Sequence, residues 1–382
     1  MNDTNHSDFE TQIERFSDAF VDFRYIYEDI FKTKDLNLKF WEDFSSAIYK
    51  IVPTHIAQKG APLYIDPSIE DPKENEVQVR MASTMISPGT ERAHILALPN
   101  ANQNFPYVPG YCCAGYVEKV GAKVTGFRPG DRVCCFAEGV GHRQIGNVVA
   151  TRVAHIPDGM PFDYAAFNGL AQTSMQGVRK CGIELGESVL VYGRGIVGQL
   201  ALQFAKANGA CPAIGAARDP EKLRIAEGCG ADLVLNCKDK NLRELVAPYT
   251  KDGAGPSVVL DCTGSASAFS DACDAAANYA RVCILGCPRG VEPFNFYRLA
   301  QLKSLNIIGA HAVFSVPQDR SQPRLWTYAD DIACYNALVM RGSVNVEPLI
   351  TSRIDWQDAT EAYEGLLSWN KGALAVIIHW CE

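Results

Sequence analysis

The sequence predicts an α/β protein in which a helical N-terminal extension precedes a β-rich domain and a doubly wound parallel sheet. Three observations predict this class. Aromatic residues recur every three or four positions between residues 7 and 31, apolar and polar residues alternate from about residue 47, and apolar strands alternate with helices after residue 168. With 382 residues, the chain is also too long for one small domain, since domains usually have about 100 to 200 residues.

The first element is a helix within residues 1–45, starting near Ser7 and reaching about Phe31. Its apolar side chains line one helical face, and Ser7 with Glu10 forms a capping box at its start. We expect this aromatic stripe to pack on the body of the protein or on a second subunit. The alternative is a docking site for another protein.

Residues 46–168 are expected to form the β-rich domain. Val77, Val79 and Met81 alternate with polar residues, as in a half-buried strand, and Gly and Pro interrupt the pattern at short intervals. The chain is expected to return to this domain over residues 315–382, which end in the apolar strand ALAVIIHW.

Residues 169–314 alternate between apolar strands and helices. Strands without polar positions are typical of a parallel sheet that helices cover on both faces. The expected strands are SVLVYG, AIGAA, DLVLN, SVVLDCTG, VCILG and LNIIGA.

Composition and charge narrow the class of partner. The net charge of −8 offers no basic surface to a phosphate backbone, so we expect a small-molecule substrate and not nucleic acid. No apolar run approaches the roughly 18 residues of a membrane helix, and the polar amino terminus lacks the order of a signal peptide. A cytoplasmic protein that does not bind membranes is therefore expected.

The 14 cysteines are scattered and form no C-x-x-C pair, which favours reduced thiols over a disulfide framework. Cys112 with Cys113, and Cys134 with Cys135, are adjacent in expected strands. Adjacent side chains of a strand point to opposite faces, so neither pair can hold one ion together. We expect buried thiols that pack as small apolar groups.

The most specific motif is a G-x-G-x-x-G turn between the strand SVLVY and a helix that ends near Asn208 and Gly209. In this context the glycines permit a tight turn, close approach of a pyrophosphate and packing of helix on strand. The diphosphate would sit on the free N–H groups of the helix. The expected dinucleotide-binding residues of the turn are Gly193, Arg194, Gly195, Ile196, Val197 and Gly198.

The end of the second strand predicts which dinucleotide binds. An acidic residue there would bind the ribose hydroxyls of NAD, but the position is Ala217, followed by Arg218. A guanidinium suits the 2′-phosphate of NADP, and Asp219 before Pro220 is expected to cap the next helix. We therefore expect NADP(H) as the cofactor. Lys222, like Arg194, would add positive charge there or be a solvated surface residue.

From about Ala47 onward these residues resemble the medium-chain dehydrogenase/reductase family. The resemblance implies a GroES-like partial β-barrel, a Rossmann domain and hydride transfer to or from nicotinamide in a cleft between them. It also implies a homodimer joined edge to edge near Leu305–Ala310, and cofactor contacts at Thr173, Thr263, Gly264 and Gly286, with Asn168 near the nicotinamide. The segments that carry it are FRPGDRV, VAHIP, LGESVLVYGRGIVG, EKLRIAEGCGA and SVVLDCTG.

The sequence departs from the zinc enzymes of that family at all three catalytic ligand positions. Those positions here are Ser87, Tyr111 and Gly169, and the four-cysteine structural zinc lobe is also missing. A catalytic zinc needs three protein ligands, so we expect no metal. The wording I-S-P-G-T-E and P-G-Y resembles a zinc-free branch that includes bacteriochlorophyllide-type dehydrogenases.

Without zinc, another group must protonate the oxygen that hydride transfer leaves charged. Tyr111 stands where the family has a zinc-binding His, so its phenol is the first candidate. The alternative is a core tyrosine with a satisfied hydroxyl. His142 is the second candidate, or a surface histidine, and Thr90 is the third. Glu91 is expected to pair with Arg92 or to cap a helix.

Three functions fit the sequence. The favoured one is a zinc-independent NADP(H)-dependent oxidoreductase that acts on a carbonyl/alcohol pair of a medium-sized, partly apolar metabolite. The second is an enoyl or imine reductase of the same family, in which hydride goes to carbon with less need for a metal. The third is a catalytically silent NADP-binding scaffold that uses the N-terminal helix as its contact.

Overall fold

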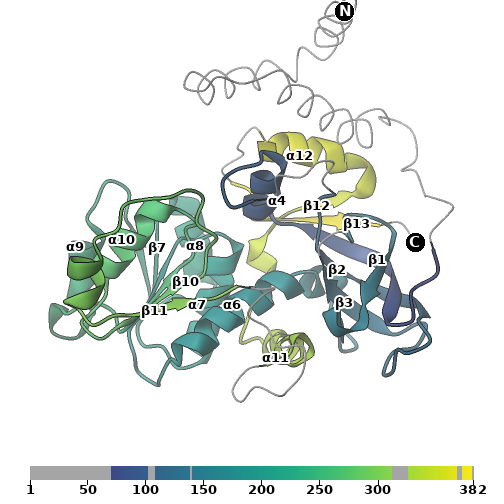
Figure 1. Cartoon of the computed structure of the whole chain (residues 1–382), viewed down its shortest axis with the longest axis horizontal. Coiled ribbons are helices and arrows are strands. Elements are labelled where there is room, and N and C mark those ends of the chain that lie inside the picture. Colours follow the sequence, from purple (N-terminus) through teal and green to yellow (C-terminus); the bar gives the residue numbers. More distant parts are fainter. Residues whose placement is uncertain (1–69, 102–107, 138–139, 312–325, 368–371, 381–382) are drawn as a thin grey trace, which may run out of the picture.

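The computed structural model describes residues 70–101, 108–137, 140–311, 326–367 and 372–380. The predicted N-terminal helix lies outside the described residues. In the described part, two lobes each contain one sheet, and the helix α6 (Asn168–Cys181) runs between them (Figure 1). The predicted fold class, a GroES-like mixed sheet followed by a parallel Rossmann sheet, is confirmed.

The parallel sheet has the strand order β11-β10-β9-β6-β7-β8, and every neighbouring pair is parallel. Each strand overlaps an apolar run that the sequence predicts, and β10 begins one residue before its run, at Arg281. The strands are β6 (Val189–Tyr192), β7 (Ala213–Ala217), β8 (Leu233–Asn236), β9 (Val258–Asp261), β10 (Arg281–Ile284) and β11 (Asn306–Gly309).

Helices cover both faces of this sheet, which explains why its central strands lack polar positions. Along β6, Val189 and Val191 pack on the side of α6 and α7, whereas Leu190 and Tyr192 pack on the side of α9 and α10. The helices are α7 (Ile196–Ala207), α8 (Pro220–Gly228), α9 (Leu242–Val246) and α10 (Ala266–Ala275).

The other lobe is built on a mixed sheet of order β12-β13-β1-β2-β3-β5, with β4 also paired to β1. The C-terminal strand β13 pairs antiparallel with β1 and parallel with β12, so the chain returns to its first domain as predicted. The strands are β1 (Glu76–Ile86), β2 (Cys112–Val120), β3 (Arg132–Phe136), β4 (Ile145–Val149), β5 (Val153–His155), β12 (Ile350–Asp355) and β13 (Ala375–His379).

Helix α6 joins the lobes because it contacts β2 and β3 on one side and α7, β9 and β10 on the other. Its Gln176 and Arg179 both donate to Asp331 of α11, at 2.6 and 3.0 Å. The remaining helices of the first lobe are α4 (Pro88–Ile95), α5 (Phe162–Ala165), α11 (Tyr328–Met340) and α12 (Ala359–Leu367).

Short helical turns complete the described chain. One is a π-helical turn, η4 (Tyr297–Gln301), and the others are 3₁₀ turns. The 3₁₀ turns are η1 (Ala150–Arg152), η2 (Ala247–Tyr249), η3 (Lys251–Gly253), η5 (Glu347–Leu349) and η6 (Trp356–Asp358).

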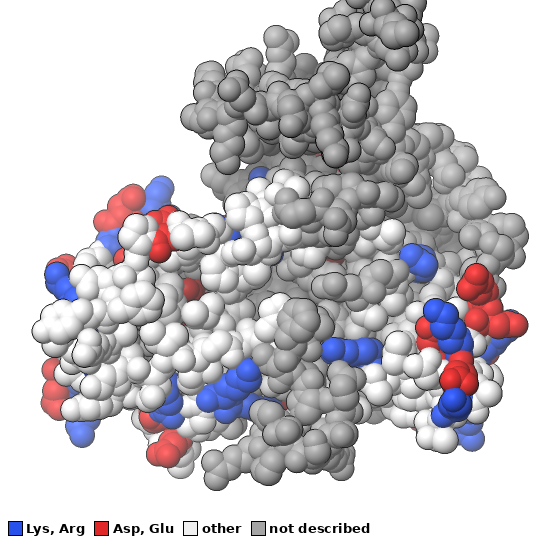
Figure 2. Space-filling model, in the orientation of Figure 1, with Lys and Arg blue, Asp and Glu red and all other residues white. Residues whose placement is uncertain are grey.

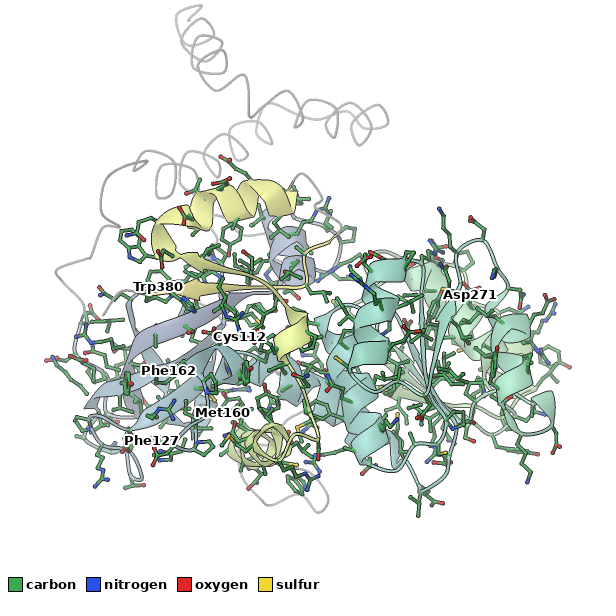
Figure 3. All side chains as sticks on the ribbon, turned by 180° about the vertical axis from the view of Figure 1, so that it is seen from behind. Cys112, Phe127, Met160, Phe162, Asp271 and Trp380 are labelled. Carbon is green, nitrogen blue, oxygen red and sulfur yellow. The ribbon has the colours of Figure 1, made fainter. Side chains whose placement is uncertain are left out.

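All 13 cysteines that the structure describes are free thiols, as predicted, but the expectation that they are buried holds for only eight of them. Cys211 and Cys287 are exposed, and three others are half-buried. Cys112 and Cys134 belong to one hydrophobic cluster, and their neighbours Cys113 and Cys135 belong to another, on the opposite face of the sheet. Figure 3 shows Cys112 near the middle of the molecule, in the mixed-sheet lobe. Adjacent cysteines therefore do not share a site.

None of the helices in the described ranges is long and apolar enough to cross a membrane. On the face shown in Figure 2, basic and acidic residues lie side by side at both ends and form no single basic stripe.

Candidate active site

The glycines of the predicted dinucleotide turn differ in backbone angle and in the space around them. Gly193 has φ +93°, and a Cβ there would lie 2.7 Å from the Thr263 amide nitrogen. A Cβ at Gly198 would lie 2.0 Å from the Gly193 carbonyl oxygen. Gly195 has no atom within 4 Å of its Cβ position, so this side of the turn is open at the start of α7. Two glycines permit packing and the third leaves room for a ligand.

The predicted Thr263, Gly264 and Gly286 meet the turn at the carboxyl edge of the parallel sheet. A Cβ at Gly286 would lie 2.7 Å from the Gly264 amide nitrogen, so the two loops touch through their backbones. Asp261 fixes Thr263 by accepting from its amide at 2.9 Å and its hydroxyl at 2.7 Å. Burial raises the pKa of Asp261, and the Thr263 hydrogen bonds oppose that shift. The structure thus assembles one backbone cradle.

Helix α6 brings Thr173 to the same edge. The Ser174 hydroxyl donates to the Val197 carbonyl at 3.0 Å, so α6 packs against the first turn of α7. Thr173 is half-buried and donates to the Gly169 carbonyl at 2.8 Å. Asn168 differs from the expectation because it is fully buried, where it donates to the Cys113 carbonyl and accepts from Tyr328. Its amide holds α6 to β2 and α11.

These features fit a nicotinamide dinucleotide. The main chain at residues 193–198 would hold the diphosphate, because the N–H groups at the start of α7 are free and Gly195 is open. Asp219 caps α8 by accepting from the Glu221 amide at 3.0 Å, as predicted, which leaves Arg218 as the exposed charged side chain after β7. Lys222 is half-buried and its carbonyl accepts from Gln199.

Arg194 does not lie where the sequence places it. It is expected to contribute charge at the cofactor surface or to be solvated, but it is only 2% exposed. Its guanidinium donates to the Gly198 carbonyl at 2.7 Å and to the Gln199 side chain. The side chain folds back beneath the turn and lies over Gly215 of β7, whose Cβ position is 3.5 Å from the Arg194 Nε.

Three hydroxyl groups gather at the place of the absent zinc ligands. The side chains of Ser87 and Thr90 face the Tyr111 phenol closely enough to act against the rise of its pKa. Tyr111 and Ser87 are buried, and Thr90 is half-buried. Burial raises the pKa of Tyr111 well above its usual range, and the nearby Cys112 and Glu91 raise it further. Tyr111 is therefore a protonated phenol, able to donate a hydrogen bond or a proton.

His142 lies behind these hydroxyls with both ring nitrogens engaged. Nδ1 is 2.8 Å from the Thr84 hydroxyl and Nε2 is 3.2 Å from a carboxylate oxygen of Glu91. Its side chain is 4% exposed, so the alternative of a surface histidine is wrong, and as a candidate proton donor it does not face open space. The same Glu91 also accepts from the Ser87 amide at 2.7 Å and from the Tyr363 hydroxyl. His142 therefore acts inside a buried network and offers no free nitrogen to a substrate.

The residues at the three ligand positions do not fit a zinc ion. Ser87 and Tyr111 bring hydroxyl groups, and a Cβ at Gly169 would lie 2.4 Å from the Phe136 ring and 2.8 Å from the Cys112 sulfur. The Phe136 ring thus takes the space of a third ligand, with its centroid 5.6 Å from that of Tyr111. Among the described residues, no three His, Cys, Asp or Glu side chains are grouped to hold a metal.

Sequence reasoning missed Phe136, the direct role of Ser87 and the part that Gln199 plays beneath the turn. The signal for Ser87 is the order Ser-Pro at the start of α4, where Ser87 is the N-cap residue but, unlike Asp219 before α8, makes no side-chain cap hydrogen bond. Nothing in the sequence around Phe136 or Gln199 indicates their neighbours.

Two family models match the chain. The alcohol dehydrogenase GroES-like domain matches residues 73–172 and the zinc-binding dehydrogenase model matches residues 197–322, together more than half of the chain. Sorbitol dehydrogenase of Halalkalibacterium halodurans is 27% identical over 295 residues, covering 69% of this chain and 81% of that protein.

One further protein is similar in sequence to about half of the chain, and one solved structure is similar in fold. The 2-methylene-furan-3-one reductase of Solanum lycopersicum is 31% identical over 189 residues, or 47% of this chain and 49% of that protein. The crystal structure of galactitol-1-phosphate dehydrogenase from Escherichia coli superposes with a TM-score of 0.71 at 20% identity, over 81% of this chain and 94% of that one.

Proposed function

The chain belongs to the medium-chain, zinc-type alcohol dehydrogenase family, and on that premise we propose that it is a zinc-independent NADP(H)-dependent oxidoreductase. Its substrate is a carbonyl/alcohol pair of a medium-sized, partly apolar metabolite. The observation that carries the proposal is the cluster of Ser87, Thr90 and Tyr111 hydroxyls in place of the zinc ligands. The Phe136 ring beside Tyr111 favours an apolar substituent next to the reacting oxygen.

The proposed reaction joins two transfers. When bound, the cofactor supplies hydride to the carbonyl carbon and leaves as its oxidised form. The Tyr111 phenol gives its proton to the carbonyl oxygen, which becomes the alcohol. Thr90 and Ser87 donate to the phenolate that remains, and Thr90, being half-buried, passes a proton back from solvent. Because its pKa is raised, Tyr111 is protonated at neutral pH and is present in the form that carbonyl reduction requires.

The position of Tyr111 supports a donor function over a purely packing one. Glu91 holds the Ser87 amide, and His142 packs against Gly110, where a Cβ would lie 2.8 Å from the His142 ring. The backbone on both sides of the hydroxyl cluster is thereby fixed. Losing one preorganised donor to a developing oxyanion typically costs about a hundred- to a thousandfold in turnover.

The preference for NADP(H) rests on Arg218. Arg218 is exposed directly after β7. The carboxylate of the neighbouring Asp219 caps α8, so it is not available to bind a ribose. A charge-assisted contact with the 2′-phosphate is worth roughly 1.5 to 3 kcal/mol, which is tenfold or more in affinity.

A double-bond reductase is the second candidate. The 2-methylene-furan-3-one reductase is similar over about half of its length, and a site without zinc suits hydride transfer to carbon. In that reaction Tyr111 would protonate carbon or the enolate oxygen and not an alkoxide.

We also propose a homodimer. β11 is the last strand of the parallel sheet and pairs only with β10 among the described residues. Ile307 on this strand is 41% exposed and Leu302 beside it is 60% exposed. An unpaired, apolar edge is usually covered in a native protein, and a second copy of the same edge would cover it.

The full chain tests the proposal directly. NADPH oxidation is followed with a panel of ketones, conjugated enones and cyclic imines, while elemental analysis measures zinc. Turnover of ketones without stoichiometric zinc is the expected result. Turnover of enones or imines alone would move the assignment to the second candidate. Tight NADPH binding with no turnover of any class would favour a silent binding protein.

A further inference from the structure

Arg194 is a buried cation beneath the dinucleotide turn. It lies between Gly193 and Gly195, yet only 2% of its surface is exposed. One guanidinium nitrogen donates to the Gly198 carbonyl at 2.7 Å, and the other donates to the Gln199 side chain. Gln199 in turn donates to the Lys222 carbonyl at 2.7 Å. The side chain thus links the first turn of α7 to the first turn of α8.

Its positive charge has no anionic partner. Among the described residues, no carboxylate forms an ion pair with Arg194, its Nε has no hydrogen-bond partner, and both acceptors that it reaches are neutral. Burial lowers the pKa of Arg194 to about 10, so it remains a cation at neutral pH. A buried charge that only neutral groups compensate costs free energy in the folded protein.

The charge also lies at the unfavourable end of a helix. The start of α7 carries the partial positive charge of the helix dipole and free N–H groups, so a cation there is repelled. An anion bound at the same helix end is attracted both by the positive end of the helix dipole and by the Arg194 charge. Gly195 leaves that side of the turn open, which gives an anion access within about one helical turn of the guanidinium.

We propose that Arg194 is an electrostatic determinant of dinucleotide affinity, in which its buried, unpaired charge strengthens binding of the diphosphate that NADH and NADPH share. This inference rests on the proposed dinucleotide function. Arg194 acts through its field and does not touch the ligand. Its role therefore differs from that of Arg218, which is exposed and is proposed to recognise the 2′-phosphate.

The test compares charge with shape. Arg194→Met removes the charge and keeps an apolar chain of similar length, Arg194→Gln removes the charge and keeps a donor, and Arg194→Lys keeps the charge and loses the forked hydrogen bonds. Each variant and the wild type are titrated with NADH and NADPH at low and high salt, and thermal unfolding is measured without cofactor.

The expected result has three parts. Arg194→Met and Arg194→Gln lower the affinity for both NADH and NADPH about tenfold, as expected for the loss of one charge at an effective dielectric constant near 20. The ratio of the NADPH affinity to the NADH affinity does not change, and the affinities depend less on salt concentration than those of the wild type. The cofactor affinities of Arg194→Lys stay within about threefold of those of the wild type. The midpoint of thermal unfolding without cofactor is not lowered in the neutral variants, because the uncompensated charge is gone.

Wild-type affinity in both neutral variants would overturn the inference while the proposed function stands. Equal losses in Lys, Met and Gln, together with a lowered unfolding midpoint, would also overturn it and leave Arg194 as a structural link between α7 and α8. A wild-type chain that binds neither NADH nor NADPH would refute the proposed function, and this inference with it.

Discussion

The Nε2 atom of His142 lies 3.2 Å from a carboxylate oxygen of Glu91, and both side chains are buried. Glu91 also holds the Ser87 amide at 2.7 Å, so the loop that carries the hydroxyl cluster is tied to a residue 51 positions further along the chain. Trp380, labelled in Figure 3, donates to the Thr84 hydroxyl that contacts the other nitrogen of His142. The site depends on contacts between distant segments.

Tyr111→Phe is expected to lower turnover about a hundred- to a thousandfold, because it removes only the donor hydroxyl. NADPH affinity measured by fluorescence titration should not change, which places the loss in the chemical step. Tyr116→Phe is the matched control, since Tyr116 lies on β2, is 43% exposed and is away from the cluster of Ser87, Thr90 and Tyr111 hydroxyls. Near-wild-type turnover in Tyr111→Phe would contradict the assignment of the donor.

Arg218→Ala is expected to narrow the NADPH-over-NADH preference by about tenfold or more, since it removes a charged partner for the 2′-phosphate. Titration of both cofactors measures the ratio. Arg224→Ala in the following helix α8 is the control, because Arg224 is exposed and, among the described residues, forms an ion pair with Glu221. Equal affinities for NADH and NADPH in the wild type would refute the NADP assignment.

Gly169→Ala is expected to destabilise the protein by about 1 to 3 kcal/mol, although alanine ordinarily favours a helix. The added Cβ would overlap the Phe136 ring at 2.4 Å. Chemical denaturation measures the free energy of unfolding, and the Phe136→Leu background should recover part of the loss. Gly89→Ala in α4 is the control, since nothing lies within 4 Å of its Cβ position, and it should change stability little. A stable Gly169→Ala variant would show that a third ligand side chain fits.

Asp331 gives a prediction for pH. Burial raises its pKa to about 6, against an ordinary value near 3.9, despite the Arg179 guanidinium at 3.0 Å. The folded state then binds this proton more readily than the unfolded state does. Stability from this group is therefore present below about pH 4 and lost as pH rises through about 6.

Asp331→Asn should remove this contribution. The wild-type free energy of unfolding, relative to that of the variant, should rise by about 2 kcal/mol between pH 7 and pH 4. Asp330→Asn, a change at the adjacent capping residue, should not reproduce the pH dependence of the difference. Parallel denaturation curves for wild type and Asp331→Asn at all pH values would contradict the raised pKa.

Light scattering at micromolar concentration is expected to give the mass of a dimer. Ile307→Lys should shift that mass toward the monomer, because two copies of the charge would meet across the paired β11 edges. Leu185→Lys is the control, since Leu185 is 89% exposed on another part of the same lobe. A monomeric wild type would refute the proposed assembly.

Local sequence determined the elements of this protein. The apolar runs predict the six strands of the parallel sheet because its central strands are buried on both faces, although the edge strand β11 is largely exposed. The turn at residues 193–198 predicts the cradle because only glycine fits at Gly193 and Gly198. The Asp219 cap and the opposite faces of the adjacent cysteines follow from the same local rules.

Tertiary structure alone decided where the site's side chains lie. Arg194 folds beneath its turn and lies against Gly215 on the next strand. Phe136 fills the volume beside Gly169 because β3 and α6 pack there. His142 is drawn inward by Thr84 and Glu91, which are more than 50 residues away in the sequence. A side chain in a loop takes its direction from such long-range contacts, because local spacing fixes only the path of the backbone.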